Sequence, residues 1–366
     1  MKVLILSANT GGGHNSTARA LADQLVKQNI EYEIADTLAF ISEKVSDFIS
    51  WGHSYVYRKL PKLFGVGYRF EEKHPPRFIY EQCARGAEAL YAELTEKKFD
   101  AVLCVHVFSG MMMTEVRERL SCKIPFYFIA TDYTCSPGVL EIKANGYLIP
   151  HRMLLGEFVR NALIPADRMF ATGIPIGEVF YEREEKAEAR AALELPVEGR
   201  IVLLGCGSMG AGRLEKSAMM LSKHLPQDTT LVVLCGKNEK VYAELLPYAS
   251  ERLRVLGFTE HVSTYMSAAD LYITKPGGLT TSEAIAKRLP MVFINAVPGC
   301  ETRNFDFLIS RGVAVGAKKW KQVAVLVQKS MRDPSLLEKQ IEAMKLFTVH
   351  NAAEQICRMM VHDLNQ

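Results

Sequence analysis

Short, continuous runs of apolar residues alternate with helix-like segments along this chain of 366 residues, and the alternation occurs in two sets. The first set begins at residues 3–6 and the second at residues 201–204. Such runs are typical of strands that are buried on both faces of a parallel sheet, with helices covering the two faces. Because the charged segment 182–190 lies between the sets, the sequence predicts two α/β domains in tandem.

The remaining strand candidates divide between the same two sets. Those of the first are residues 32–35, 101–105 and 126–130, and those of the second are residues 231–234, 253–256, 271–274 and 291–295. We expect one domain at residues 1–172 and another at residues 173–349, with a helix at about 350–366 that packs back on the first. In such folds ligands bind beyond the carboxyl ends of the strands, so the loops there are the places to look for chemistry.

Composition argues against several classes of protein. The formal net charge is only +3, which predicts no general attraction to nucleic acid. The 8 cysteines are scattered without a C-x-x-C pair, which argues against a zinc site and fits a reducing compartment. No apolar run approaches the roughly 18 residues of a membrane span. We therefore expect a cytoplasmic protein without a nucleic-acid partner, at most peripheral to a membrane.

A glycine-rich turn follows the first strand of each set, as in dinucleotide-binding proteins. Gly205-Cys-Gly-Ser-Met-Gly210 has the G-x-G-x-x-G pattern, but the next strand ends at residues 234–237 without the acidic residue that would hold an adenosine ribose. The first set has the opposite defect. Asp36 is suitably placed, but residues 11–16 lack the last glycine of the G-x-G-x-x-G pattern. Neither half completes the fingerprint, so the sequence argues against a dehydrogenase.

The segment from Lys275 to Glu283 carries a stronger signal. Its Pro-Gly-Gly sequence forces a tight turn after a strand, where backbone N–H groups can approach a ligand closely. A helix that opens after this turn would present its N-terminal N–H groups to an anion such as pyrophosphate. Glu283 then has two interpretations: a capping box with Thr280 as N-cap, or a carboxylate that accepts hydrogen bonds from ribose hydroxyls.

His14 and Asp132 are the candidate catalytic residues. His14 follows a glycine turn at a strand end, where a substrate hydroxyl could reach it and where imidazole could act as a general base. Asp132 lies in another strand-end loop and could orient His14 or contact an acceptor. Both also have structural interpretations, namely backbone hydrogen bonding by the histidine and an Asx-turn by the aspartate.

Aromatic and basic residues are interleaved between Trp51 and Phe70, and no acidic residue occurs from Phe48 to Phe70. This mixture suits the headgroup region of an anionic bilayer, an RNA-binding groove, or an ordinary aromatic-rich helix. Under the first interpretation, the residues expected to contact the membrane are Trp51, Tyr55, Arg58, Lys59, Lys62 and Phe64.

Five motifs in a fixed order resemble one family of enzymes. They are Gly11-Gly-Gly-His14 with Ala18, Thr131-Asp-Tyr-Thr-Cys-Ser-Pro137, Thr172-Gly-Ile-Pro175, Lys275-Pro-Gly-Gly-Leu-Thr280 with Glu283, and Pro298-Gly299 with Glu301 and Asn304. Each motif is weak alone, but together they resemble the monogalactosyldiacylglycerol synthase and processive diacylglycerol glucosyltransferase family over nearly the whole chain. That family is related to the GlcNAc transferase of peptidoglycan synthesis.

The resemblance implies a GT-B fold, in which two Rossmann-like domains have parallel sheets that face a central cleft. The C-terminal domain would bind a UDP-sugar without an essential metal ion or other cofactor. Glu283 would hold the ribose, Phe258 would meet uracil through its backbone, and helix termini would stabilise the departing diphosphate. The full set of donor-binding residues implied in this way is Gly13, Gly207, Ser208, Phe258, Lys275, Gly277, Gly278, Leu279, Thr280, Glu283, Glu301 and Asn304.

The resemblance also implies the reaction. An inverting displacement would move a hexose from UDP to diacylglycerol or a related glycolipid, with His14 as base and Asp132 beside it on the acceptor side. The protein would dock on an anionic membrane at the inner face of the cell membrane. Two alternatives stay open: a polyprenyl-linked or soluble acceptor from cell-wall or natural-product synthesis, and a low-turnover regulatory protein that binds a UDP-sugar.

This chain departs from the family pattern at positions that bear on the donor. Gly177 stands where the family usually has an arginine that reaches the donor phosphates, and Cys300 replaces the usual glutamine of the sugar-contacting motif. A thiol makes weaker hydrogen bonds to sugar hydroxyls than an amide does. Residues 138–141 also lack the aromatic residue common there. The sequence therefore leaves the donor sugar, the exact acceptor, the processivity and the oligomeric state open.

Overall fold

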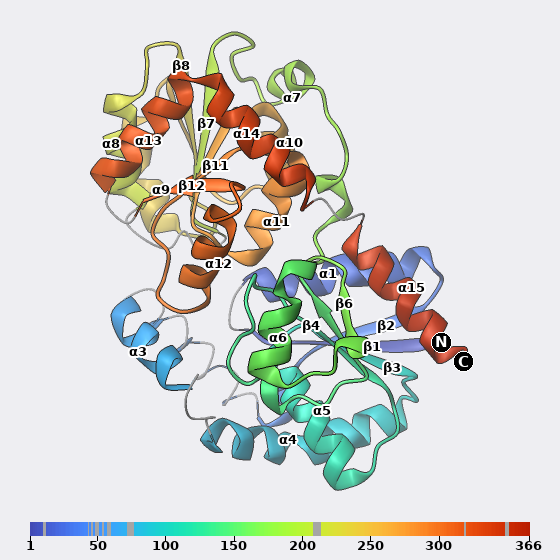
Figure 1. Ribbon diagram of the computed structural model, residues 1–366. Coiled ribbons are helices and arrows are strands. Elements are labelled where there is room, and N and C mark those ends of the chain that lie inside the picture. The colour runs from blue at the N-terminus through green and yellow to red at the C-terminus, as the bar shows by residue number, and fades with distance from the viewer. Residues whose placement is uncertain are drawn as a thin grey trace. The chain divides into compact units, whose positions relative to one another are not determined.

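The chain forms two compact units, each of which contains one parallel sheet (Figure 1). Unit 1 comprises Met1–Gly177, Val297–Cys300 and Val349–Gln366, and unit 2 comprises Glu178–Ala296 and Glu301–Thr348. The computed structural model describes residues 1–9, 12–42, 44, 47, 51–52, 55–56, 60–71, 77–207, 214–317, 320–347 and 351–366.

The sheet of unit 1 has six strands in the order β2-β1-β3-β4-β5-β6, and all neighbouring pairs are parallel. Its strands are β1 Lys2–Ser7, β2 Glu31–Asp36, β3 Ala101–Cys104, β4 Phe126–Ile129, β5 Gly146–Ile149 and β6 Met169–Ala171. Its longer helices are α1 Gly12–Lys27, α3 Pro61–Glu71, α4 Arg77–Glu96, α5 Val107–Leu120, α6 Leu155–Ala162 and α15 Ala352–Leu364. Short 3₁₀ turns are η1 Thr37–Phe40, η2 Val139–Glu141, η3 Arg152–Leu154 and η4 Ala166–Arg168.

The C-terminal helix α15 belongs to the core of unit 1, although the chain reaches it from unit 2. Ile356, Cys357 and Met360 recur at helical spacing and are completely buried in the same apolar cluster as Leu21 of α1. The Tyr127 hydroxyl of β4 donates a hydrogen bond to the Asp363 carboxylate at the other end of α15. Burial and this bond together fix the helix on unit 1.

The sheet of unit 2 also has six parallel strands, in the order β12-β11-β10-β7-β8-β9. Its strands are β7 Arg200–Gly205, β8 Thr229–Leu234, β9 Leu253–Leu256, β10 Leu271–Thr274, β11 Met291–Phe293 and β12 Ala314–Gly316. Its helices are α7 Lys186–Ala192, α8 Leu214–His224, α9 Glu239–Leu245, α10 Val262–Ala268, α11 Gly278–Lys287, α12 Cys300–Ile309, α13 Trp320–Arg332 and α14 Pro334–Lys345, with 3₁₀ turns η5 Glu178–Phe180 and η6 Leu246–Tyr248.

The two sheets confirm the predicted fold class. Every strand candidate named from the sequence lies on a strand, because continuous apolar runs are what a sheet buried on both faces requires. No strand was predicted from the sequence at β5, β6 or β12, and β6 and β12 are edge strands of three residues that are only partly buried. Within the described ranges, no helix is long and apolar enough to cross a membrane.

Each sheet contains one point at which the strand order reverses, and ligands of doubly wound folds bind there. In unit 1 this point lies between β1 and β3, and in unit 2 it lies between β7 and β10. The register of unit 2 pairs Gly205 at the end of β7 with Thr274 at the end of β10. The loops that follow these two strands therefore start side by side.

Candidate active site

The loop after β10 forms the start of helix α11. The N–H of Gly277 donates to the Lys275 carbonyl over 2.8 Å, which closes the tight turn, and Gly277 itself is the N-cap of α11. The first intrahelical bond runs from the Thr281 N–H to the Gly277 carbonyl over 3.0 Å. The N–H groups at the beginning of a helix have no partner within it, so Gly278, Leu279 and Thr280 supply the donors that an anion needs.

This helix start rules out the capping-box interpretation of Glu283. The N-cap is Gly277 rather than Thr280, and no side chain caps the helix. Glu283 therefore lies in the second turn of α11, too far along the helix to reach back to an N-cap N–H. Thr280 is an early helical residue, because the turn at Pro276 already gives the backbone the direction of the helix.

Glu283 is a carboxylate with no polar partner in the part of the chain that the structure describes. Burial raises its pKa to about 7. Within the described residues it makes no hydrogen bond and no ion pair, although its charge acts on the nearby hydroxyl of Tyr272. An unpaired carboxyl group in a poorly solvated position is costly to maintain and is a frequent mark of a functional site.

Helix α12 brings two further predicted residues to the same loop. The Lys275 ammonium lies 2.9 Å from the Glu301 carboxylate, which is only 4% exposed. The Asn304 amide donates to the Pro276 carbonyl over 2.9 Å. The positive charge of Lys275 is thus shared with Glu301, and α12 holds the turn that precedes α11 in place.

Gly207, after β7, faces this cluster. Its φ of +73° lies in the left-handed region, and a Cβ on it would lie 3.2 Å from Cε of Lys275. A side chain here would crowd both the backbone and the lysine. Ser208, the next predicted contact, lies outside the described residues.

Phe258 follows β9, two strands away from the reversal point. Its ring is 61% exposed, and the Lys237 ammonium lies 5.5 Å from the ring centre. Phe258 lies beyond the carboxyl end of β9, and its contact to uracil through the backbone stays a prediction.

His14 lies at the reversal point of unit 1, in the first turn of α1. Its Nδ1 is 2.9 Å from the carbonyl oxygen of Val105, after β3, and 3.2 Å from the hydroxyl of Thr131, after β4. A carbonyl oxygen can only accept, so Nδ1 carries the proton and the neutral ring keeps its lone pair on Nε2. Gly13 precedes His14 in the same turn.

The sequence missed two residues that support this arrangement. The His106 ring packs edge-on against His14 with 4.6 Å between the ring centres, and its Nδ1 caps α5 by accepting from the Phe108 N–H. The position of His106 directly after a buried strand was the one available signal. Asp132, the second predicted catalytic residue, is half-buried in the neighbouring loop.

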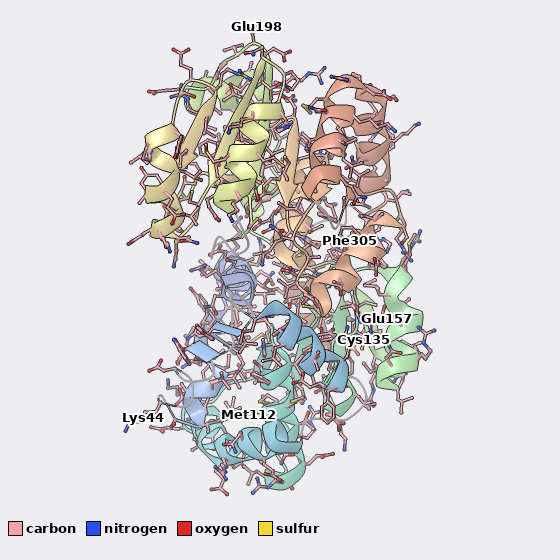
Figure 2. The ribbon with its side chains drawn as sticks, turned by 90° about the vertical axis from the view of Figure 1, so that its left-hand side faces the viewer. Lys44, Met112, Cys135, Glu157, Glu198 and Phe305 are labelled. Carbon is pink, nitrogen blue, oxygen red and sulfur yellow. The ribbon has the colours of Figure 1, made fainter. Side chains whose placement is uncertain are left out.

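Glu157 of α6 is the other missed residue. Its carboxylate accepts from the Thr134 hydroxyl over 2.7 Å and from the Cys135 N–H over 2.8 Å, and Figure 2 places Glu157 beside Cys135. Two hydrogen bonds to one carboxylate oxygen hold the loop that contains Thr131 and Asp132. No local pattern around Glu157 indicated this contact, which joins residues more than twenty positions apart.

The predicted membrane segment is described only in part. Trp51 and Tyr55 are exposed, and their rings stack with 5.3 Å between centres. Phe64 is half-buried, and a Cβ on Gly299 would lie 3.3 Å from its ring. Exposed apolar side chains of the 60–71 segment instead belong to Leu60, Leu63, Val66 and Phe70. Arg58, Lys59 and the side chain of Lys62 lie outside what the structure describes.

No cluster of His, Cys, Asp and Glu side chains that could hold a metal ion occurs among the described residues. In unit 2 the groups that could face a diphosphate are the start of α11, Gly207 and Lys275. The turn at Pro276 and the paired charges of Lys275 and Glu301 are held by protein contacts alone. The chemistry of these groups is that of an anion site with a hydroxyl-binding carboxylate beside it.

Comparison with known proteins agrees with this chemistry. Residues 14–176 match the monogalactosyldiacylglycerol (MGDG) synthase family, and residues 201–298 match the glycosyltransferase family 28 C-terminal domain. A processive diacylglycerol beta-glucosyltransferase of Staphylococcus carnosus is 26% identical over 377 residues, which cover 100% of this chain and 93% of the relative. One of Bacillus cytotoxicus is 28% identical over 352 residues, covering 94% and 89%.

Solved structures resemble the whole chain. MurG of Acinetobacter baumannii superposes with a TM-score of 0.65 at 16% identity, covering 98% of both chains. HepE of Anabaena, solved in complex with UDP-glucose, gives a TM-score of 0.59 at 14% identity, covering 99% of this chain and 100% of that one. These likenesses confirm the GT-B fold that the motifs predicted.

Proposed function

We propose that this chain, a member of the monogalactosyldiacylglycerol synthase and processive diacylglycerol glucosyltransferase family, transfers a hexose from a UDP-sugar to diacylglycerol or a related glycolipid. The observation that carries the proposal is Glu283, a half-buried carboxylate that pairs with no described residue, in the helix that starts at the strand-order reversal of unit 2. A diphosphate and a ribose are adjacent in a UDP-sugar. The groups that would bind them, the N–H groups at the start of α11 and the Glu283 carboxylate, lie within two turns of the same helix.

The donor binds to unit 2. Its diphosphate accepts hydrogen bonds from the N–H groups of Gly278, Leu279 and Thr280, where the helix dipole also favours negative charge. The ribose hydroxyls donate to Glu283, and uracil lies at Phe258. The helix terminus takes the place of a metal ion in stabilising the UDP that leaves, so the reaction needs no metal or other cofactor.

The sugar of the donor meets α12. Glu301 and Asn304 begin this helix beside the Lys275 loop, and Cys300 stands at its first position. Since Lys275 is paired with Glu301, we assign its main role to shaping the loop and only a secondary one to the diphosphate. Which hexose is used depends on this part of the site.

The acceptor is activated from unit 1. The Nε2 of His14 takes the proton of the acceptor hydroxyl while that oxygen forms its bond to the anomeric carbon and the bond from this carbon to the diphosphate breaks. Attack from the face opposite the leaving group inverts the anomeric centre. Val105 holds the His14 ring through Nδ1, and Asp132 is the second candidate on the acceptor side.

The lipid acceptor implies contact with a membrane. Leu63, Val66 and Phe70 of α3 are each more than half exposed, and with Trp51 they offer apolar groups to a bilayer surface. We place the protein at the cytoplasmic face of the cell membrane as a peripheral protein, attracted to anionic lipids and without a nucleic-acid partner.

A screen of donors against acceptors tests the proposal. Purified protein is incubated with UDP-glucose or UDP-galactose and vesicles that contain diacylglycerol, and products are identified by mass spectrometry. We expect UDP release and a glycolipid with at least one donor, and loss of both in His14→Ala. The exposed His224→Ala of α8 is the matched control.

Two results would redirect the proposal. Product formed on a soluble or polyprenyl-linked acceptor, with no flotation on anionic vesicles, would exclude a membrane lipid as the substrate. Tight UDP binding without product from any donor would instead favour a regulatory protein, for which the thiol of Cys300 in place of an amide is the specific reason.

A further inference from the structure

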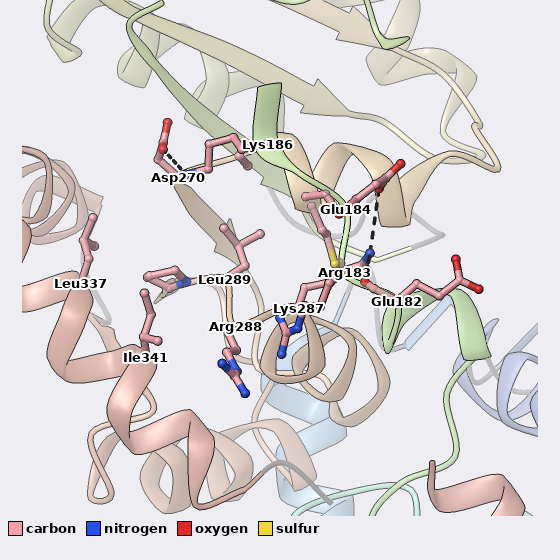
Figure 3. Close-up of a pocket in the computed structure, with 14 residues that line it drawn as sticks. Glu182, Arg183, Glu184, Lys186, Asp270, Lys287, Arg288, Leu289, Leu337 and Ile341 are labelled. Atoms are coloured by element: carbon pink, nitrogen blue, oxygen red, sulfur yellow. Dashed lines mark hydrogen bonds and ion pairs between the residues drawn. The ribbon is translucent and has the colours of Figure 1, made fainter. Parts of the chain in front are cut away.

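A separate cavity of about 290 Å³ lies in unit 2, at the edge of the sheet opposite the donor loops (Figure 3). It is bordered by the residues that precede β10 and β11, by the C-terminal end of α11, by α14 and by the segment that leads into α7. Helix α11 runs from Gly278 to Lys287, so its two ends are about 15 Å apart. The cavity is therefore distinct from the donor site at the first turn of that helix.

Two arginines of this cavity lack a counter-ion. Among the described residues, neither Arg183 nor Arg288 makes an ion pair or a side-chain hydrogen bond. Desolvation lowers the pKa of the Arg183 guanidinium, and the positive charge of Arg288 lowers it further. Both arginines are exposed and line the same cavity, and the charge of Arg288 acts on Arg183, so an anion bound there would interact favourably with both guanidinium groups.

Two of the three acidic residues that line the cavity, Asp270 and Glu184, form ion pairs with cationic side chains. Asp270 is 2.6 Å from the Lys186 ammonium and 2.8 Å from the guanidinium of Arg190, so its charge is compensated. Glu184 lies 4.0 Å from Lys287, whose ammonium also donates to the Glu182 carbonyl over 2.9 Å. Figure 3 shows the pairs Lys186–Asp270 and Lys287–Glu184.

The rest of the lining is apolar. Met266 and Leu289 are buried side chains of the floor, and the half-buried Leu337 and Ile341 of α14 form one wall. A small inorganic anion would use the arginines and leave this wall unoccupied. A ligand with an anionic head and an apolar chain would use both parts.

We propose that this cavity binds a phosphate monoester that carries an apolar chain, with Arg183 and Arg288 on the phosphate and α14 on the chain. The planar guanidinium group matches two phosphate oxygens at once, which favours phosphate over a lone carboxylate. The segment that contains Arg183 leads from unit 1 into α7, so the ligand would link this segment to α11 and α14.

The test uses calorimetric titration of the full chain with hexyl phosphate, ethyl phosphate and inorganic phosphate, in the presence of saturating UDP. We expect hexyl phosphate to bind at least roughly tenfold more tightly than ethyl phosphate, because the longer chain buries additional methylene groups. The double variant Arg183→Gln/Arg288→Gln should weaken hexyl phosphate roughly tenfold or more, since charge-assisted hydrogen bonds are lost.

Arg332→Gln, an exposed arginine at the end of α13, is the matched control and should bind hexyl phosphate as the wild type does. Unchanged thermal unfolding of the double variant establishes that it is folded. Hexyl phosphate binding that survives in the folded double variant, or that is absent from the wild type, would overturn the proposal. Equal affinities for hexyl and inorganic phosphate would refute the apolar half of the site. None of these results depends on glycosyl transfer.

Discussion

Replacing Glu283 by glutamine should have opposite effects on donor binding and on stability. Burial raises the pKa of this carboxyl to about 7, and no described residue pairs with it. A carboxylate kept for structure would stabilise the fold, and its loss would be destabilising at every pH. A carboxylate kept for a ligand lowers stability whenever it is ionised, and its loss should make the folded protein more stable at alkaline pH.

The sign and size of the stability effect follow from the two pKa values. The folded value of about 7 lies above the ordinary value of 4.5, so any stability that the group contributes is present below pH 4.5 and is lost as the pH rises through 7. Because the carboxyl group ionises more readily in the unfolded chain, its raised pKa lowers the free energy of unfolding by about 3 kcal/mol at pH 8 and by under about 1 kcal/mol at pH 5. The glutamine amide has its own burial cost, but that cost is the same at both pH values.

The affinity for UDP should fall in Glu283→Gln, whereas the stability at alkaline pH should rise. Loss of charge-assisted hydrogen bonds to the ribose should weaken UDP binding in Glu283→Gln by roughly 10- to 100-fold at pH 8. Only about a tenth of the wild-type carboxyl groups are ionised at pH 6, so the advantage of the wild type over the variant should fall about tenfold between pH 8 and pH 6. Protonation of UDP itself cancels in this ratio.

Urea unfolding at pH 5 and pH 8 and calorimetric titration with UDP at pH 6 and pH 8 measure both effects. Relative to the wild type, the variant should gain about 2 kcal/mol of unfolding free energy between pH 5 and pH 8. Glu338→Gln, an exposed site on α14, should show neither change. The reasoning is refuted if Glu283→Gln binds UDP as tightly as the wild type and is equally destabilised at both pH values.

Further substitutions separate catalysis, loop support, sugar recognition and core stability. His14→Asn should lower the rate of transfer roughly 10²- to 10⁴-fold with little change in UDP affinity, measured by product formation and calorimetry; weaker UDP binding would contradict the role as base. Glu157→Ala should lower the unfolding free energy by about 1 to 3 kcal/mol in urea, because the Thr134 hydroxyl and the Cys135 N–H lose their acceptor. Cys300→Gln should raise kcat/KM for the preferred donor by roughly two- to tenfold, and an unchanged value would mean that this position does not contact the sugar. Arg190→Met should destabilise unit 2 by about 3 to 5 kcal/mol in urea without altering UDP affinity, because it leaves Asp270 with one buried partner fewer.

Parts of the fold were predictable because their causes are local. Continuous apolar runs such as residues 201–204 and 231–234 can be buried only in an interior strand, and both lie on strands of unit 2. The very short β6 and β12 were missed, since three residues carry no period. The position of α15 in the core of unit 1 depends on contacts with α1, more than three hundred residues earlier.

The candidate site also combines features that local sequence predicts with features that depend on distant contacts. The turn at Pro276 and the helix start after it follow from the glycines themselves, so an anion site was predictable there. The proton on Nδ1 of His14 is set by the carbonyl of Val105, 91 residues away, and no pattern near either residue indicates this bond. Glu157 bonds to Cys135 across 22 residues, and His106 packs against His14 from a different strand-end loop.

The sequence by itself thus determined the two parallel sheets, the glycine turns at their strand ends and the resemblance to a family of glycosyltransferases, because apolar runs and glycine-dependent turns are encoded within a few neighbouring residues. Only the tertiary structure decided between the two interpretations of Glu283, a capping box and a carboxylate available to a ligand. Its spacing from Thr280 suited a capping box, but α11 begins at Gly278 with Gly277 as its N-cap, and the half-buried carboxyl group pairs with no described residue. Strand register and helix packing fix such environments, and both depend on contacts between residues far apart in the chain.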